Sequence, residues 1–143
     1  MADILKISDA TALALHSMVH LALDPEGQST TTEIAEVLEA SRHHLSKVHQ
    51  RLVAAGLIRS RRGPAGGVAL AKDPKKIMLL EIYEVMEGPM SCSPCLFGKE
   101  ACPRNGCMLS SLLPELVLQV RNYFENTTLA QLTAESNWKG IDK

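Results

Sequence analysis

TTTEIAEVLEASRHHLSKVHQRLVAAGLIRSRRGPAGGVAL, residues 30–70, contains the patterns that predict the fold. Thr30 and Glu33 stand three residues apart as in a capping box, which predicts the start of a short helix. After a tight turn, a second helix begins at Arg42 and ends at Gly56. The inward apolar positions of this second helix are Leu45, Val48, Leu52 and Val53. Two helices joined in this way have the spacing of a helix-turn-helix.

The residues after this helix pair predict a β-hairpin. Residues 57–62 and 68–70 can run as strands, and the GPAGG sequence at 63–67 has the composition of a tight loop. A helix-turn-helix followed by such a hairpin is the winged-helix arrangement, in which the second helix enters the major groove and the wing lies along the backbone or minor groove. Taken alone, the loop could be a plain turn or a weak phosphate loop. The chain has neither the GxxxxGK nor the GxGxxG motif, so nucleotide binding has little support.

Basic residues are concentrated in the same part of the chain. The segment from Arg42 to Lys76 holds nine lysines and arginines against one acid, Asp73. The whole chain has 15 basic and 16 acidic residues and a net charge of −1, so the rest of it is strongly acidic. A surface that attracts polyanions, on a body that does not, suits docking on nucleic acid in one orientation. The alternative is a solvated surface of uneven charge.

Composition limits the class of protein. The chain has 143 residues, the size of a single domain, and its 45% hydrophobic but only 3% aromatic content favours a helical core of aliphatic side chains. No stretch approaches the roughly 20 apolar residues of a membrane span, and the N-terminus lacks a signal-peptide pattern. We therefore expect a cytoplasmic protein without a membrane partner. Neither GxSxG nor HExxH occurs, so we do not expect an enzyme.

Further helices are predicted on both sides of the winged core. Ser8 can cap a long first helix that ends before Asp24, and a helix within residues 77–86 ends at Gly88. Beyond residue 108 an apolar stripe predicts one more long helix. The stripe consists of Leu109, Leu112, Leu116, Val117, Val120, Tyr123 and Phe124. We expect this helix to pair with its twin in a homodimer; packing back on its own domain, against the first helix, is the alternative.

The predicted fold is mainly α with a small β-hairpin wing, that is, a winged helix-turn-helix followed by a long C-terminal dimerisation helix. We divide the chain into a DNA-binding domain at residues 1–88, a cysteine loop at 89–107, and a dimerisation helix with a C-terminal tail at 108–143. A homodimer doubles the DNA contacts, and it requires a roughly palindromic operator in double-stranded DNA.

All four cysteines fall in one short segment. They are spaced C-x2-C-x6-C-x4-C and are Cys92, Cys95, Cys102 and Cys107. In a reducing compartment such clusters are more often metal ligands or redox groups than disulfides. Zinc ribbons usually return a second C-x2-C pair after a longer stretch, whereas a compact, unevenly spaced run with neighbouring prolines is closer to loops that bind iron-sulfur clusters. Spacing alone leaves an iron-sulfur cluster, zinc and thiol redox chemistry open, in that order.

Several of these motifs together resemble the Rrf-two family of winged-helix transcriptional regulators, which includes IscR-like and NsrR-like proteins. The motifs are SRHHLSKVHQRL at 41–52, AGLI at 55–58, RGPAGG at 62–67 and LA at 70–71. The resemblance extends from about Ile7 to about Leu132. It implies a dimeric repressor or activator whose DNA affinity responds to an iron-sulfur cluster, and hence to iron supply, oxidants or nitric oxide.

The resemblance also assigns cluster ligands. Cys107 matches the last ligand of the family and Cys102 the middle one, whereas the first matches either of the two upstream cysteines. The family commonly borrows a fourth ligand from elsewhere in the chain. Where IscR-like members have a histidine this chain has Ser110, and where some NsrR-like members have an aspartate it has Ala12. We therefore predict that all four cysteines hold a [4Fe-4S] or [2Fe-2S] cluster, with zinc as the second choice.

The predicted DNA contacts come from the second helix of the pair and from the wing. His43 and Lys47 are expected at base edges, although His43 could be an ordinary surface residue, and Gly66 lets the wing backbone approach DNA. Ser41 and five arginines are expected mainly at phosphates or in the minor groove. These arginines are Arg42, Arg51, Arg59, Arg61 and Arg62. The alternative function is a zinc-stabilised or thiol-redox winged-helix protein that acts through protein contacts.

Overall fold

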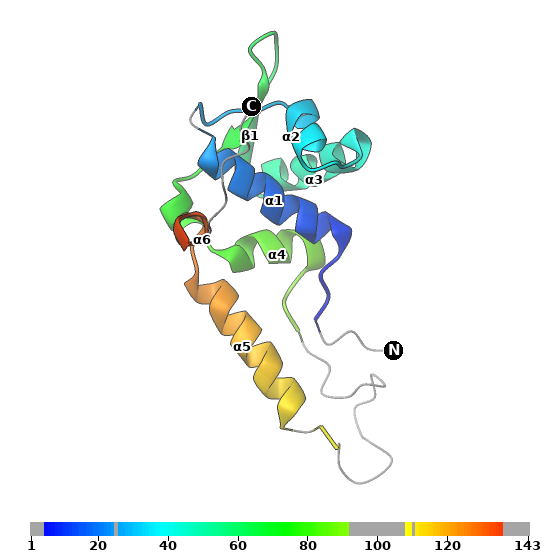
Figure 1. Cartoon of the computed structure of the whole chain (residues 1–143), viewed down its shortest axis with the longest axis vertical. Coiled ribbons are helices and arrows are strands. Elements are labelled where there is room, and N and C mark those ends of the chain that lie inside the picture. The colour runs from blue at the N-terminus through cyan, green and yellow to red at the C-terminus, as the bar shows by residue number, and fades with distance from the viewer. Residues whose placement is uncertain (1–4, 25, 92–107, 110, 136–143) are drawn as a thin grey trace.

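The computed structural model describes residues 5–24, 26–91, 108–109 and 111–135. In chain order, its elements are α1 (Asp9–Leu23), α2 (Thr31–Val37), α3 (Arg42–Ala54), β1 (Ile58–Arg61), β2 (Gly67–Leu70), the 3-10 turn η1 (Pro74–Lys76), α4 (Leu79–Glu87), α5 (Leu112–Asn126) and α6 (Leu129–Glu135). Within these ranges the fold is mainly α with one antiparallel hairpin, as the sequence predicts. Figure 1 shows the hairpin projecting at one end of the molecule and α5 at the other.

The three N-terminal helices begin where hydroxyl side chains can cap them. Ser8 accepts a hydrogen bond from the backbone N–H of Thr11, and Ser41 accepts one from that of His44. Thr30 forms the predicted capping box with Glu33, since each side chain bonds the backbone N–H of the other. Such caps satisfy N–H groups that have no partner within a helix and stabilise it by about 1 kcal/mol each. The predicted caps at Ser8 and Thr30 are therefore confirmed, and the structure adds the cap at Ser41.

The core lies where α1 meets the helix-turn-helix, the hairpin and α4. Helix α1 contacts α3, α4, α6 and β2, and α2 contacts α3. The largest side chains that are fully buried there come from the helices and from β1. They include Met18, Ile34, Leu45, Leu52, Ile58, Ile82 and Leu129. Because each such side chain stabilises the fold by roughly 1.5–3 kcal/mol, this core holds the helix-turn-helix rigidly on α1 and α4.

The hairpin is enlarged by a third stretch of chain from the N-terminal side. Its strands pair in the register Ile58↔Leu70 to Arg61↔Gly67. Ser29, just before α2, bridges to Val68 on the other side of β2, with N···O distances of 3.1 and 2.8 Å. A Cβ at Gly67 would lie 2.7 Å from the Ser29 carbonyl oxygen, so the close approach of these strands requires glycine.

Helix α5 packs on α4 rather than on α1. The rings of Tyr83 and Phe124 meet edge to face with their centroids 5.8 Å apart, and Arg121 Nη1 donates to the Met90 carbonyl oxygen at 3.0 Å. Pro114 lies in the first turn of α5, where its missing N–H breaks no helical hydrogen bond. Much of the remaining apolar surface of the helix faces solvent. Its exposed apolar side chains are Leu112, Leu116, Leu118 and Tyr123, each 42–57% accessible.

Candidate nucleic-acid interface

Helix α3 has one buried side and one exposed, largely basic side. Leu45, Val48 and Leu52 pack into the core. The predicted contact residues Ser41, Arg42, His43 and Lys47 are exposed. The hydroxyl of Ser41 also caps the helix by accepting a hydrogen bond from the His44 N–H, which holds this side chain at the N-terminal end of α3. The amphipathic pattern of the sequence therefore places four of the predicted DNA contacts on accessible surface.

His49 is a polar residue on the buried side of α3. Its Nδ1 lies 3.1 Å from Thr31 Oγ1 of α2, and its Nε2 lies 3.1 Å from Ser17 Oγ of α1. The residue is 3% exposed, and burial lowers its pKa from 6.5 to about 4. The imidazole is therefore neutral at physiological pH and joins three helices by hydrogen bonds. It is a structural histidine and not a cation for DNA.

Sequence reasoning did not single out His49, although a signal for it exists. It stands four residues after Leu45 and three before Leu52, on the same side of the helix as these apolar residues. A histidine at such a position is buried if hydroxyl partners are available. Those partners come from Ser17 and Thr31, which are 32 and 18 residues away in sequence.

Arg51 differs from the other predicted arginines. The sequence predicts it among the phosphate contacts, but its guanidinium Nη2 donates to the carbonyl oxygens of Val85 and Met86 at 2.6 and 3.0 Å. Both acceptors belong to the end of α4. The structure thus gives Arg51 an intramolecular partner.

The wing presents an arginine-rich surface beside a small hollow. Arg59, Arg61 and Arg62 are exposed. A hollow of about 280 Å³ opens on the hairpin, and it is lined by Gln28, Arg59, Ser60, Arg61, Gly67 and Ala69. Gln28 Nε2 donates to the Ala65 carbonyl oxygen at 2.6 Å, which fastens the wing loop to the segment before α2.

The wing loop also explains Gly66 in steric terms. A Cβ at this position would lie 2.5 Å from the Arg61 carbonyl oxygen and 2.7 Å from that of Gly63. Its backbone N–H donates to the Gly63 carbonyl oxygen at 2.8 Å, which closes the turn. A side chain therefore cannot be added without opening the loop, whether or not DNA lies against it.

Among the described residues, no acid forms an ion pair with the exposed cations of α3 and the wing. In the part of the chain that the structure describes, the ion pairs are Lys6 with Glu87, Lys72 with Glu81 and Arg121 with Glu125. None of them involves the predicted DNA contacts. These cations thus remain available to a polyanion.

The predicted metal ligands cannot be placed. Cys92, Cys95, Cys102 and Cys107, and also Ser110, lie outside the described residues. Among residues 5–24, 26–91, 108–109 and 111–135, no group of three or more histidine, cysteine and acidic side chains could hold a metal ion. Over the same ranges, no helix has both the length and the apolar character needed to cross a membrane.

Comparison with known proteins agrees with this arrangement. The model of the Rrf-two family, described as iron-dependent transcriptional regulators, matches residues 7–135. An HTH-type transcriptional regulator of Aquifex aeolicus is 33% identical over 128 residues, which is 87% of this chain and 89% of that protein. The HTH-type regulator BadM of Rhodopseudomonas palustris is 37% identical over 58% of this chain and 53% of its own.

Solved structures share the whole fold. CymR, the global cysteine regulator of B. subtilis, superposes with a TM-score of 0.76 at 30% identity, over 93% of this chain and 99% of that one. IscR of T. potens superposes with a TM-score of 0.72 at 24% identity, over 97% and 93% of the two chains, which shows the shared fold alone. The chain belongs to the Rrf-two family of winged-helix regulators, and it is a DNA-binding transcriptional regulator and not an enzyme.

Proposed function

We propose that this regulator is a homodimer whose affinity for a palindromic operator is switched by an iron-sulfur cluster held by Cys92, Cys95, Cys102 and Cys107. The observation that carries the proposal is the gathering of every thiol of the chain in one 16-residue segment of an iron-dependent family. Four thiolates repel one another unless a cation neutralises them, and they are the donor set that [2Fe-2S] and [4Fe-4S] clusters use. A bound cluster would supply redox, iron or nitric oxide sensitivity.

The proposed DNA interface uses the exposed side of α3 and the wing. His43 and Lys47 read base edges in the major groove, with Ser41 and Arg42 at the adjacent phosphates. Three arginines of the wing, together with the backbone at Gly66, follow the phosphates or the minor groove. The wing arginines are Arg59, Arg61 and Arg62. Their exposure and the absence of ion pairs to them among the described residues support this role.

The proposed dimer forms through α5. Among the described residues the helix packs chiefly on α4, and it leaves four large apolar side chains exposed. A second copy would cover them and place two recognition helices on one face of DNA. The cysteine segment joins Ser91, just after α4, to Met108, just before α5. A change in this segment therefore acts on the junction between the DNA-binding body and the dimer helix, and so on the distance between the two wings.

Anaerobic purification followed by a visible spectrum and by iron, sulfide and zinc analysis tests the proposal. We expect visible absorption with stoichiometric iron and sulfide, and we expect a Cys102→Ser variant to lose both. A colourless protein that carries zinc, or no metal even after anaerobic reconstitution, contradicts it. That outcome instead favours a thiol-based or zinc-stabilised regulator in the reducing cytoplasm. CymR, a structural neighbour, is a cysteine regulator.

A further inference from the structure

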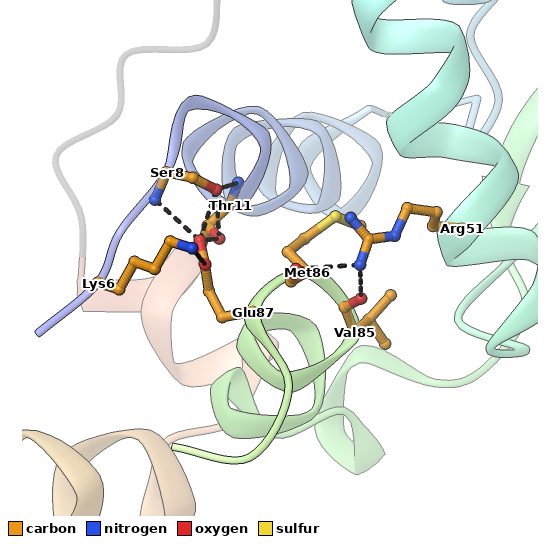
Figure 2. Close-up of polar contacts among 7 residues, drawn as sticks. All are labelled: Lys6, Ser8, Thr11, Arg51, Val85, Met86 and Glu87. Atoms are coloured by element: carbon orange, nitrogen blue, oxygen red, sulfur yellow. Dashed lines mark hydrogen bonds and ion pairs between the residues drawn. The ribbon is translucent and has the colours of Figure 1, made fainter. Parts of the chain in front are cut away.

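Arg51 lies on the recognition helix α3, but its guanidinium bonds to the backbone of α4 (Figure 2). One nitrogen, Nη2, donates to the carbonyl oxygens of both Val85 and Met86. These carbonyls lie in the last turn of α4, where backbone oxygens have no partner within the helix. A cation at this place also lies at the negative end of the helix dipole. Arg51 therefore completes the end of α4 and joins it to α3.

Glu87, the last residue of α4, ties the same turn to the start of α1 (Figure 2). Its carboxylate accepts a hydrogen bond from the backbone N–H of Ser8 at 2.8 Å, and others from the hydroxyls of Ser8 and Thr11. Burial acts to raise the pKa of Glu87, but the hydrogen bonds from Ser8 and Thr11 outweigh it and hold this pKa below its ordinary value. The carboxylate is thus charged at neutral pH, and the turn is held to α1 as well as to α3.

The Arg51 tie fixes the orientation of α3 on α4 in a way that apolar packing alone does not, and Glu87 holds the same turn of α4 to α1. The buried side of α3 is mostly aliphatic, and contacts of this kind are not directional. Two hydrogen bonds from one nitrogen to neighbouring carbonyls require a particular rotation of α3 about its own axis and a particular position of α3 along α4. Base contacts from His43 and Lys47 depend on these same two parameters, because a bidentate contact in the major groove tolerates little displacement.

We propose that Arg51 is a positioning residue for DNA recognition, acting through the last turn of α4 and not through a DNA phosphate. The inference rests on the DNA interface proposed above. It assigns to the turn formed by Val85, Met86 and Glu87 the task of presenting α3 to the major groove at one angle. Sequence-specific binding then depends on Arg51, whereas the general attraction of the protein for DNA does not.

The experiment compares Arg51→Ala and Arg51→Lys with Arg59→Ala, a matched control on the wing. Each full-length variant is titrated anaerobically, by fluorescence anisotropy at several salt concentrations, with two duplexes. One duplex is enriched by in vitro selection on the wild-type protein, and the other has the same bases in shuffled order. For Arg51→Ala we expect about tenfold weaker binding to the selected duplex, the equivalent of one good base contact, and unchanged binding and salt dependence on the shuffled duplex.

The two control substitutions sharpen this expectation. Arg51→Lys keeps the charge but lacks the planar guanidinium, so it shows the same selective loss to a smaller degree. Arg59→Ala weakens binding to both duplexes, and it lowers the slope of log K against log salt by about 0.9, as the loss of one phosphate contact does.

Three results overturn the proposal. Arg51 is a phosphate contact instead if Arg51→Ala weakens binding to both duplexes equally and lowers the slope of log K against log salt by about 0.9. In that case Arg51→Lys recovers the affinity. A lower melting temperature with wild-type affinity for both duplexes identifies a role in stability alone. If Arg51→Ala does not fold by circular dichroism, Arg51→Lys is judged by the same criteria. If the wild type itself does not distinguish the duplexes and shows no salt dependence, the DNA interface fails and the role of Arg51 with it.

Discussion

Helix α3 and the β1–β2 hairpin carry the predicted DNA contacts, and they are attached to the body in different ways. Helix α3 is held by a buried apolar side, by the hydrogen bonds of His49 to α1 and α2, and by Arg51 on α4. The hairpin extends from the body (Figure 1); Ser29 bridges to Val68 of β2, and Gln28 bonds the loop at Ala65. Helix α3 is thus held by three other helices, whereas the loop of the hairpin is held by the segment just before α2.

This difference suits two kinds of DNA contact. Base edges are read by short, directional hydrogen bonds, so the element that reads them must be rigid. Phosphates and groove width are read by charge, which tolerates adjustment of the backbone. We therefore expect changes that affect the support of α3 to alter stability and sequence preference, and changes in the wing to alter affinity for all DNA.

The largest effect is expected from protonation of His49, since it removes a support of α3. Its pKa is about 4 in the folded protein and about 6.5 when unfolded, so the native state binds fewer protons between these values. The contribution of neutral His49 to the free energy of unfolding is complete above pH 6.5. It falls by on the order of 3 kcal/mol as the pH is lowered toward 4. Urea unfolding at pH 7 and at pH 4.5 measures it. His49→Gln should flatten the dependence of the unfolding free energy on pH. Because His43 is an exposed histidine of the same helix, His43→Gln is the control. An equally steep profile in His49→Gln contradicts the assignment.

The next prediction compares α3 directly with the β1–β2 hairpin. Lys47→Ala should reduce discrimination between the selected and shuffled duplexes by about 1–3 kcal/mol, because it removes a base contact from a rigid helix. Arg59→Ala should leave discrimination nearly constant while weakening both complexes. Paired anisotropy titrations measure the ratio of the two dissociation constants. The reverse pattern, with Lys47 acting on all DNA and Arg59 on sequence preference, breaks the division of roles between helix and wing.

The smallest effect is expected from Gln28→Ala. The substitution removes the hydrogen bond that fastens the Ala65 carbonyl, worth about 0.5–1.5 kcal/mol, and it leaves the arginines in place. Binding to both duplexes should weaken by a few-fold, with the salt slope unchanged. Thr32→Ala in the following helix, whose side chain forms no part of this contact, is a suitable control. Wild-type affinity in Gln28→Ala shows that the wing needs no such fastening.

Local features of the fold could be predicted from sequence, whereas long-range polar contacts could not. The caps at Ser8 and Thr30 and the tight turn at Gly66 act within a few residues, so their patterns are visible in the chain and are confirmed. The partner of Arg51 is 34 residues away, and it becomes available only because α4 ends beside α3. An exposed arginine on a recognition helix predicts a phosphate contact unless that packing is known.

Glu87 shows the same limit over a longer distance. It is 79 residues from Ser8, and nothing in the sequence near either residue indicates that they meet. The apolar stripe of the last helix did predict a long helix, which is confirmed as α5, but not that it packs on α4 through Tyr83 and Phe124. Its pairing with a second copy stays a prediction, as does ligation by the four cysteines.

The claim that a cluster switches DNA binding is tested by the affinity for one selected duplex, measured before and after anaerobic iron-sulfur reconstitution of the same wild-type preparation. A cluster-switched regulator should change its dissociation constant by about tenfold or more between the two forms, within the usual range of coupling between two sites. The Cys102→Ser variant should show no change. Equal affinity of the reconstituted and cluster-free wild-type protein would contradict the claim, even if both bind the duplex tightly.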